Sequence, residues 1–123
     1  MFIDLEYAGW NYRGFDLGNH LCEYASDFLQ PDAAHVLDFG RYPSLEQRRA
    51  FARAYLGGGG GDAEEEAVAV AALVREMDEF ANASHLFWGV WGLVQARISA
   101  ISGFDFVVYA RQRLEMFAKG INN

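Results

Sequence analysis

The stretch that most constrains the fold runs from Ser84 to Ile101 and is apolar almost all round a helical wheel. A surface helix shows one apolar stripe, whereas a helix that is apolar on nearly every side is normally buried. The sequence therefore predicts a central helix. Its most apolar run, Leu86 to Val94, is too short to cross a bilayer, which takes about 20 such residues.

Other segments carry a helical apolar repeat or a helix start signal. Starts are indicated at Asp16, in an N-cap position, and at Ser44 and Asp62, which stand at capping-box spacing from Gln47 and Glu65. The chain is therefore predicted to be mainly α. The expected helices cover residues 16–28, 44–56, 62–81, 84–101 and 105–119.

Five consecutive glycines, Gly57 to Gly61, interrupt the helical pattern. A phosphate-binding loop would space its glycines and continue with Lys-Ser or Lys-Thr into a helix, whereas Asp62 and three glutamates follow here. Residues 57–62 are therefore predicted to form a flexible loop. At 123 residues, the chain is expected to be one domain or part of one.

The N-terminal residues Ile3 to Tyr7 have the pattern of a β-strand, so a short strand or hairpin is expected there. Asp4 and Glu6 would then point to the same face, with about 7 Å between their Cα atoms. Two carboxylates this close repel each other unless a cation lies near them, and a divalent metal ion would satisfy both. The alternative is an edge strand whose acidic face meets water.

The net charge of −7 and the isoelectric point near 4.8 disfavour nucleic acid and anionic membranes as partners. They suit a cationic small molecule or a metal–nucleotide complex. The single cysteine, Cys22, excludes an intrachain disulfide and a zinc–cysteine cluster, so a cytoplasmic location is expected. No signal peptide is visible after Met1.

The aromatic residues of the central helix suggest a binding site. Trp88 and Trp91 are three residues apart and share a helix face, so they could form adjacent walls of a pocket. With a tyrosine and a carboxylate, they would form a box for a cationic ammonium group. The alternative is that both tryptophans belong to the core. No nucleophilic triad is indicated, because Cys22 and His20 point to different sides of a helix.

The run IDLEYAGWNYRGFDLGNHLCEY, Ile3 to Tyr24, strongly resembles the signature of choline and ethanolamine kinases. Three later segments resemble the C-terminal blocks of that family in the same order. They are RYPSLEQRRAFARAYL, ASHLFWGVWGLVQARIS and FDFVVYARQRLEMF. The resemblance implies the C-terminal lobe of a protein-kinase-like fold, in an enzyme that moves the γ-phosphoryl group of ATP to the hydroxyl of choline or ethanolamine.

The resemblance also implies roles for individual residues. Asp4 would be the metal-binding aspartate that holds Mg²⁺ on the nucleotide phosphates, and Glu6 would support it. Asp16 would brace the catalytic loop. Five residues would surround the ammonium group of the substrate, namely Tyr7, Glu23, Trp88, Trp91 and Tyr109.

Phosphoryl transfer in this fold also needs a base aspartate, a metal-binding asparagine and an N-terminal lobe that grips ATP. No histidine in the chain starts a His-x-Asp pattern. Residues 1–123 are therefore expected to be a partial domain, the C-terminal third of such a kinase, and inactive in isolation. The alternative is a short noncatalytic product that binds or dimerises with the full-length kinase. The sequence leaves the oligomeric state open, and a homodimer of the full-length enzyme is one option.

Overall fold

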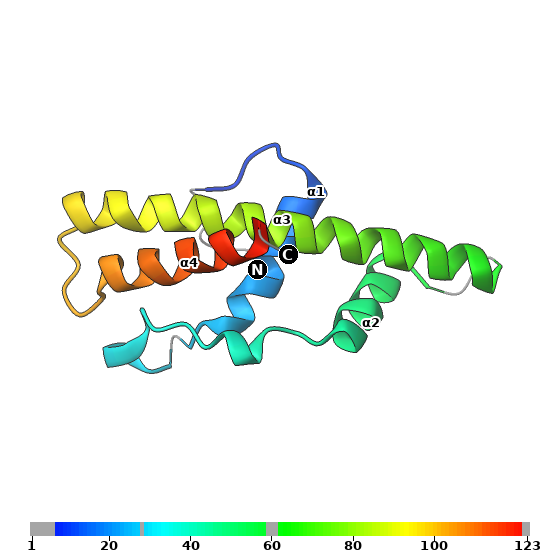
Figure 1. Cartoon of the computed structure of the whole chain (residues 1–123), viewed down its shortest axis with the longest axis horizontal. Helices are drawn as coiled ribbons and strands as arrows, with labels where there is room; N and C mark the ends of the chain where they lie inside the picture. The colour runs from blue at the N-terminus through cyan, green and yellow to red at the C-terminus, as the bar shows by residue number, and fades with distance from the viewer. Residues whose placement is uncertain (1–6, 28, 59–61, 122–123) are drawn as a thin grey trace.

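The computed structural model describes residues 7–27, 29–58 and 62–121. Figure 1 shows the long helix α3 as the spine of the molecule, with the other helices packed along it. The α-helices are α1 Arg13–Cys22, α2 Leu45–Tyr55, α3 Ala63–Ile98 and α4 Phe106–Ile121, and three short 3₁₀ turns, η1 Glu23–Ala25, η2 Pro31–Ala33 and η3 Phe39–Arg41, lie between α1 and α2.

Helix α3 is a single element of 36 residues, about 54 Å long at 1.5 Å per residue. The prediction of two helices, one over 62–81 and one starting at Ser84, is wrong. Ser84 and His85 are both buried in mid-helix. Neither residue breaks a helix as proline would, and their buried polar atoms have partners: Ser84 Oγ donates to Asn19 Oδ1 at 2.8 Å, and the His85 ring contacts Cys22 and Arg113.

Helix α1 crosses α3 at very close range. A Cβ atom at Gly18 would lie only 2.5 Å from the backbone nitrogen of Ala81, so the crossing depends on a residue without a side chain. The core beside this crossing draws on α1, α2 and α3. Its buried members are Leu17, Leu21, Ala52, Val70, Leu73, Val74 and Met77.

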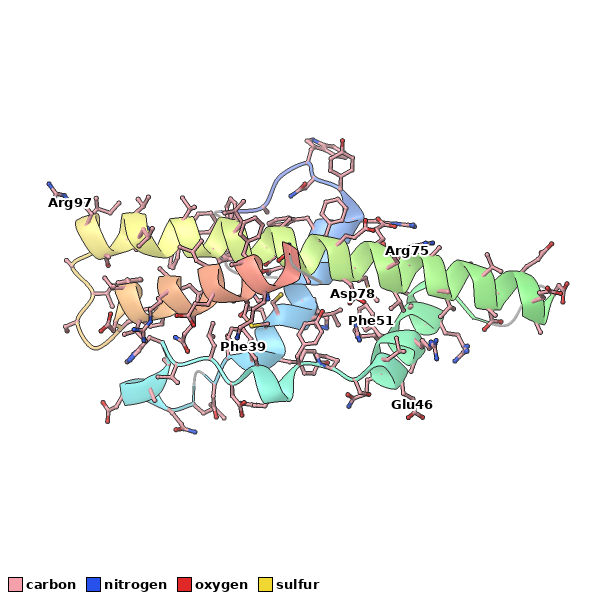
Figure 2. All side chains as sticks on the ribbon, viewed as in Figure 1. Phe39, Glu46, Phe51, Arg75, Asp78 and Arg97 are labelled. Carbon is pink, nitrogen blue, oxygen red and sulfur yellow. The ribbon has the colours of Figure 1, made fainter. Side chains whose placement is uncertain are left out.

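Helix α2 begins as the sequence predicts. Gln47 N–H donates to Ser44 Oγ at 3.3 Å and Ser44 N–H donates to Gln47 Oε1 at 2.8 Å, so the expected capping box is confirmed. Figure 2 shows Phe51 and Asp78 between α2 and α3, whereas Glu46 points away from α3. The apolar side of α2 therefore faces the spine.

The segment between α2 and α3 is the glycine-rich stretch expected as a loop. Gly57 has φ of +81°, which glycine adopts without strain, and residues 59–61 of the expected loop lie outside the described residues. Asp62 is the predicted N-cap of α3, and its Oδ1 accepts a hydrogen bond from Glu64 N–H at 3.2 Å. The cap is confirmed, although its partner is Glu64 and not Glu65.

Helix α4 runs antiparallel to the C-terminal half of α3, as Figure 1 shows. The connection turns at Gly103, whose φ is +88°. Asp105 Oδ1 then accepts hydrogen bonds from the N–H groups of Val107 and Val108, each at 3.0 Å, which satisfies donors of the first turn of α4. The α3–α4 hairpin positions the site described below.

The prediction of an N-terminal strand or hairpin is wrong. Its residues Ile3 to Glu6 lie outside the described residues, and none of the described residues forms a strand. A β-strand needs a neighbour to pair its backbone N–H and C=O groups, and the described helices and turns offer none.

The predicted N-cap at Asp16 is also wrong, because α1 begins at Arg13 and places Asp16 in its first turn.

The central position of α3 is confirmed, but its burial on nearly every side is wrong. Six large apolar side chains of its C-terminal half are 40–68% exposed, namely Leu86, Phe87, Val90, Leu93, Val94 and Ile98. Among the described residues, α1, α4, the η3 turn and Tyr7 pack against this half of α3, and they leave one face open. None of the described helices is both long and apolar enough to span a membrane.

Candidate functional site

A pocket of about 630 Å³ lies where the C-terminal half of α3 meets the start of α4 and the end of α1. Helix α3 contributes one wall, the segment that leads into α4 contributes a second, and the α1–η1 junction contributes a third. The lining residues are Tyr7, Asn19, Glu23, Trp88, Trp91, Gln95, Ile101, Phe104, Phe106 and Tyr109.

The pocket is mainly aromatic. The rings of Trp88 and Trp91 meet edge to face with 5.3 Å between their centroids. Tyr7 lies 5.6 Å from Trp88 and 6.4 Å from Trp91, and its hydroxyl accepts a hydrogen bond from Trp91 Nε1 at 2.9 Å. Tyr109 closes the opposite side, 6.3 Å from Trp91. Several π-faces therefore surround one space, which is the arrangement that attracts a cation.

Asn19 fixes the orientation of Trp88. Its side-chain oxygen accepts hydrogen bonds from Trp88 Nε1 at 2.7 Å and from Ser84 Oγ at 2.8 Å. The Ser84 hydroxyl holds the Asn19 side-chain oxygen in place, and that oxygen in turn holds the indole N–H of Trp88. The sequence does not place Asn19 in a pocket wall, since its partners are more than 60 positions away.

Glu23 brings the negative charge to the pocket, and a buried cation holds it in place. Glu23 Oε1 accepts a charged hydrogen bond from Arg113 Nη2 at 2.9 Å, and Ser26 Oγ lies 3.5 Å from Oε2. The Arg113 side chain has no exposed surface, whereas that of Glu23 is 39% exposed. The carboxylate therefore lies between a buried counter-ion and the open pocket.

The polar groups beneath the pocket are neutral apart from this pair. Arg113 can only donate, so His85 Nδ1, 3.5 Å from Arg113 Nη1, must be an acceptor. Burial, assisted by the charge of Arg113, lowers the pKa of His85 to about 4. Burial raises the pKa of the Cys22 thiol to about 11. At neutral pH the imidazole and the thiol are therefore both uncharged.

Tyr109 is held in the same network. Its hydroxyl accepts a hydrogen bond from Arg113 Nε at 3.1 Å, and the guanidinium carbon lies 5.2 Å from its ring centroid. Burial raises the pKa of Tyr109 above its usual value, although Arg113 opposes the shift. For Arg113, burial opposes the charged form, but Tyr109 and Glu23 outweigh it and keep its pKa above the ordinary value.

The structure brings together the five residues expected around an ammonium group. Tyr7, Glu23, Trp88, Trp91 and Tyr109 all line this one pocket. Their role as substrate-binding residues stays a prediction.

The residues expected to act on phosphate and metal are not among the described residues that line this pocket. Asp4 and Glu6 lie outside the described residues. Asp16 is exposed in the first turn of α1, and it has no hydrogen bond or ion pair to the side chains that the structure describes. Within the described part of the chain, no three His, Cys, Asp or Glu side chains are grouped so that they could hold a metal ion.

Several residues that line or support the pocket were not predicted. Phe104 and Phe106 pack together with 4.7 Å between ring centroids and line the side of the pocket nearest α4. Arg113 stands four residues after Tyr109, which is the spacing at which helix side chains meet. That spacing was the available signal for Arg113. For the two phenylalanines the signal was their place at the start of the helix predicted over residues 105–119, since Phe104 directly precedes it and Phe106 is its second residue.

Comparison with known proteins identifies the class of protein to which this helical hairpin and its aromatic pocket belong. The model of the choline/ethanolamine kinase family matches residues 1–118. The chain is 42% identical to mouse ethanolamine kinase 2, 39% to probable choline kinase 3 of Arabidopsis thaliana and 38% to human choline/ethanolamine kinase. The matches cover 96%, 94% and 95% of this chain. The chain belongs to the choline/ethanolamine kinase family.

The matches cover a smaller part of the relatives. They include 28% of the mouse protein, 32% of the Arabidopsis protein and 31% of the human protein. The chain therefore spans about a third of the length of the curated relatives it matches. The resemblance expected from the four sequence blocks is confirmed, and it concerns this third.

Proposed function

We propose that the chain forms the acceptor-binding part of a kinase that transfers the γ-phosphoryl group of ATP to the hydroxyl of choline or ethanolamine. The observation that carries the proposal is the aromatic pocket, in which three ring systems and Tyr109 surround one space beside the Glu23 carboxylate. Membership of the choline/ethanolamine kinase family supports the choice of ligand.

The chemistry of the pocket suits a small ammonium ion. A quaternary ammonium group has no N–H to donate, so its recognition depends on aromatic faces and on a nearby negative charge. Trp88 and Trp91 supply the faces and Glu23 supplies the charge. A primary ammonium group could use the same rings and, in addition, donate a hydrogen bond to the carboxylate.

The phosphoryl-transfer side of the reaction rests on residues outside this pocket. We propose that Asp4 and Glu6 bind a Mg²⁺ ion that accompanies ATP, and that Asp16 braces the catalytic loop. When bound, the ion would neutralise phosphate charge. The 123 residues contain no His-x-Asp sequence, so we expect them to show no turnover with MgATP and choline without a catalytic aspartate from elsewhere. A full-rate reaction by the 123 residues alone would contradict this expectation.

The pocket is tested by calorimetric titration of the chain with choline and with ethanolamine. Trp91→Ala removes one aromatic face and the partner of the Tyr7 hydroxyl, so we expect the Kd for choline to rise about threefold to thirtyfold. The rise should be smaller for ethanolamine, which loses fewer apolar contacts around its nitrogen.

The chain offers a matched control for this experiment. Trp10 is fully exposed and does not line the pocket, so Trp10→Ala should leave both Kd values unchanged. Equal effects of Trp10→Ala and Trp91→Ala, or no saturable binding of either amine by the unmodified chain, would overturn the assignment of the pocket.

A further inference from the structure

Arg113 lies behind the wall of the pocket and not in its lining. Its side chain has no exposed surface, and it stands one helical turn after Tyr109. Its nitrogens reach three different elements: Nη2 donates to Glu23 Oε1 in η1 at 2.9 Å, Nε donates to the Tyr109 hydroxyl in α4 at 3.1 Å, and Nη1 lies 3.5 Å from His85 Nδ1 in α3.

The surroundings of this guanidinium leave it a single anionic partner. His85 from α3, Cys22 from α1 and Tyr109 from α4 are all uncharged at neutral pH, because burial disfavours their charged forms. Glu23 alone, among the described side chains that Arg113 contacts, carries a negative charge. A buried cation without that partner would be strongly destabilising, so Arg113 and Glu23 constrain each other.

We propose that Arg113 is a positioning residue of the ammonium pocket. It holds Glu23 Oε1 and the Tyr109 hydroxyl at once, and so it fixes two pocket residues that come from different elements. It leaves Glu23 Oε2, which among the described side chains has only the 3.5 Å contact with Ser26 Oγ, to interact with the ligand. The inference rests on the proposed function, since it assigns Arg113 to the pocket for which an ammonium ligand is proposed.

The geometry explains why an arginine is suited to this position. The planar guanidinium directs N–H groups along several fixed lines, whereas a lysine ammonium is a compact charge on a flexible stem. Arg113→Lys would keep the positive charge beside Glu23. It would lose the fixed fork that reaches Tyr109 and His85 as well, so orientation would be lost while charge is kept.

The test is the Kd for choline of the chain carrying Arg113→Lys, measured by calorimetric titration. Loss of a charge-assisted hydrogen bond predicts about a tenfold weaker Kd. The matched control is Arg111→Lys, in the same helix. Arg111 has a side chain that is 68% exposed and a 3.8 Å ion pair with Glu115, and its replacement should leave the Kd unchanged. Circular dichroism and urea unfolding establish that each variant is folded.

A second variant separates positioning from a merely structural role. Tyr109→Phe keeps the ring that faces the pocket and removes only the hydroxyl that Arg113 holds. We expect about a threefold weaker Kd in the unmodified chain and a smaller effect of the same change when Arg113 is already lysine, because the two residues act through one hydrogen bond. If Arg113→Lys does not fold, the Tyr109→Phe measurement alone still decides, since an unchanged Kd overturns the proposal.

The outcomes distinguish this inference from the proposed function. Failure of the unmodified chain to bind either amine would remove the ammonium pocket and, with it, the role of Arg113. Normal binding by the unmodified chain, together with equal Kd values for Arg113→Lys and Arg111→Lys or purely additive effects with Tyr109→Phe, would overturn the role of Arg113 and leave the pocket intact.

Discussion

Glu23 sets the negative charge that the pocket offers to a ligand. One of its oxygens already accepts a hydrogen bond from Arg113, so part of its charge is compensated before any ligand arrives. A cation in the pocket would therefore meet a partly neutralised carboxylate, and the faces of Trp88 and Trp91 become correspondingly important. We therefore expect the proposed site to favour ligands with apolar substituents on nitrogen over bare, strongly hydrated cations.

The buried His85 makes the stability of the chain depend on pH. Its pKa in the folded state is about 4, against 6.5 for an unperturbed histidine, so below pH 6.5 the unfolded chain takes up a proton that the folded chain does not. Stability should therefore fall as the pH drops from 6.5 towards 4, by up to about 3 kcal/mol. Urea unfolding at pH 7 and pH 5 measures the loss.

Two variants test whether His85 is the group responsible. His85→Asn cannot titrate, and its amide oxygen can accept a hydrogen bond in place of Nδ1, so the difference between pH 7 and pH 5 should shrink. His20→Asn replaces an exposed histidine and should keep the full difference. If both variants behave alike, the pH dependence comes from other groups.

Single pocket residues can be predicted from the sequence only where they belong to a recognisable motif. Trp88 and Trp91 can be recognised from their spacing and from the family resemblance. Asn19 cannot be assigned to the pocket in this way, and Arg113 only through its spacing from Tyr109, because their other partners lie 28 to 90 positions distant. Such contacts depend on how the helices pack, which local sequence does not specify.

Among the helices, α2 begins at a capping box formed by Ser44 and Gln47. Ser44→Ala removes the hydroxyl that accepts from Gln47 N–H, so we expect a loss of about 1 kcal/mol in the free energy of unfolding, as for other N-caps. Ser102→Ala is the control, because Ser102 is exposed and has no hydrogen bond to the described side chains. Thermal or urea unfolding should separate the two variants, and equal midpoints would contradict the role of the cap.

Helix ends were predictable where a side chain caps them, as at Ser44 and Asp62. They were not predictable where the signal was ambiguous. Asp16 has the composition of an N-cap but lies within the first turn of α1, where an acidic residue is also favoured by the helix dipole. The expected strand failed for a different reason, since strand patterns require a partner that the described chain does not supply.

The whole molecule is organised by close helix crossings on α3. The α1 crossing at Gly18 brings Asn19 to Trp88, and the α3–α4 hairpin brings Tyr109 and Arg113 to the same half of α3. The predicted central helix therefore has the right place in the fold. Its open apolar face was not predicted, because periodicity alone does not show which sides of a helix other segments cover.

Replacement of Gly18 by alanine tests this organisation. Alanine should favour helix α1 by about 1 kcal/mol, but its Cβ would lie 2.5 Å from Ala81 N and 2.8 Å from Met77 O. These are backbone atoms that cannot turn aside, so overpacking, which costs about 1–3 kcal/mol, should outweigh the gain. We therefore expect Gly18→Ala to unfold at a lower urea concentration than the unmodified chain.

The same substitution should also weaken the pocket. If α1 moves away from α3, Asn19 loses its hydrogen bonds to Trp88 and Ser84, and the Kd for choline should rise together with the loss of stability. Gly9→Ala is the matched control, because a Cβ at Gly9 meets no atom within 4 Å. A Gly18→Ala chain that unfolds and binds as the Gly9→Ala chain does would show that the crossing tolerates a wider separation and that Trp88 is held by other contacts.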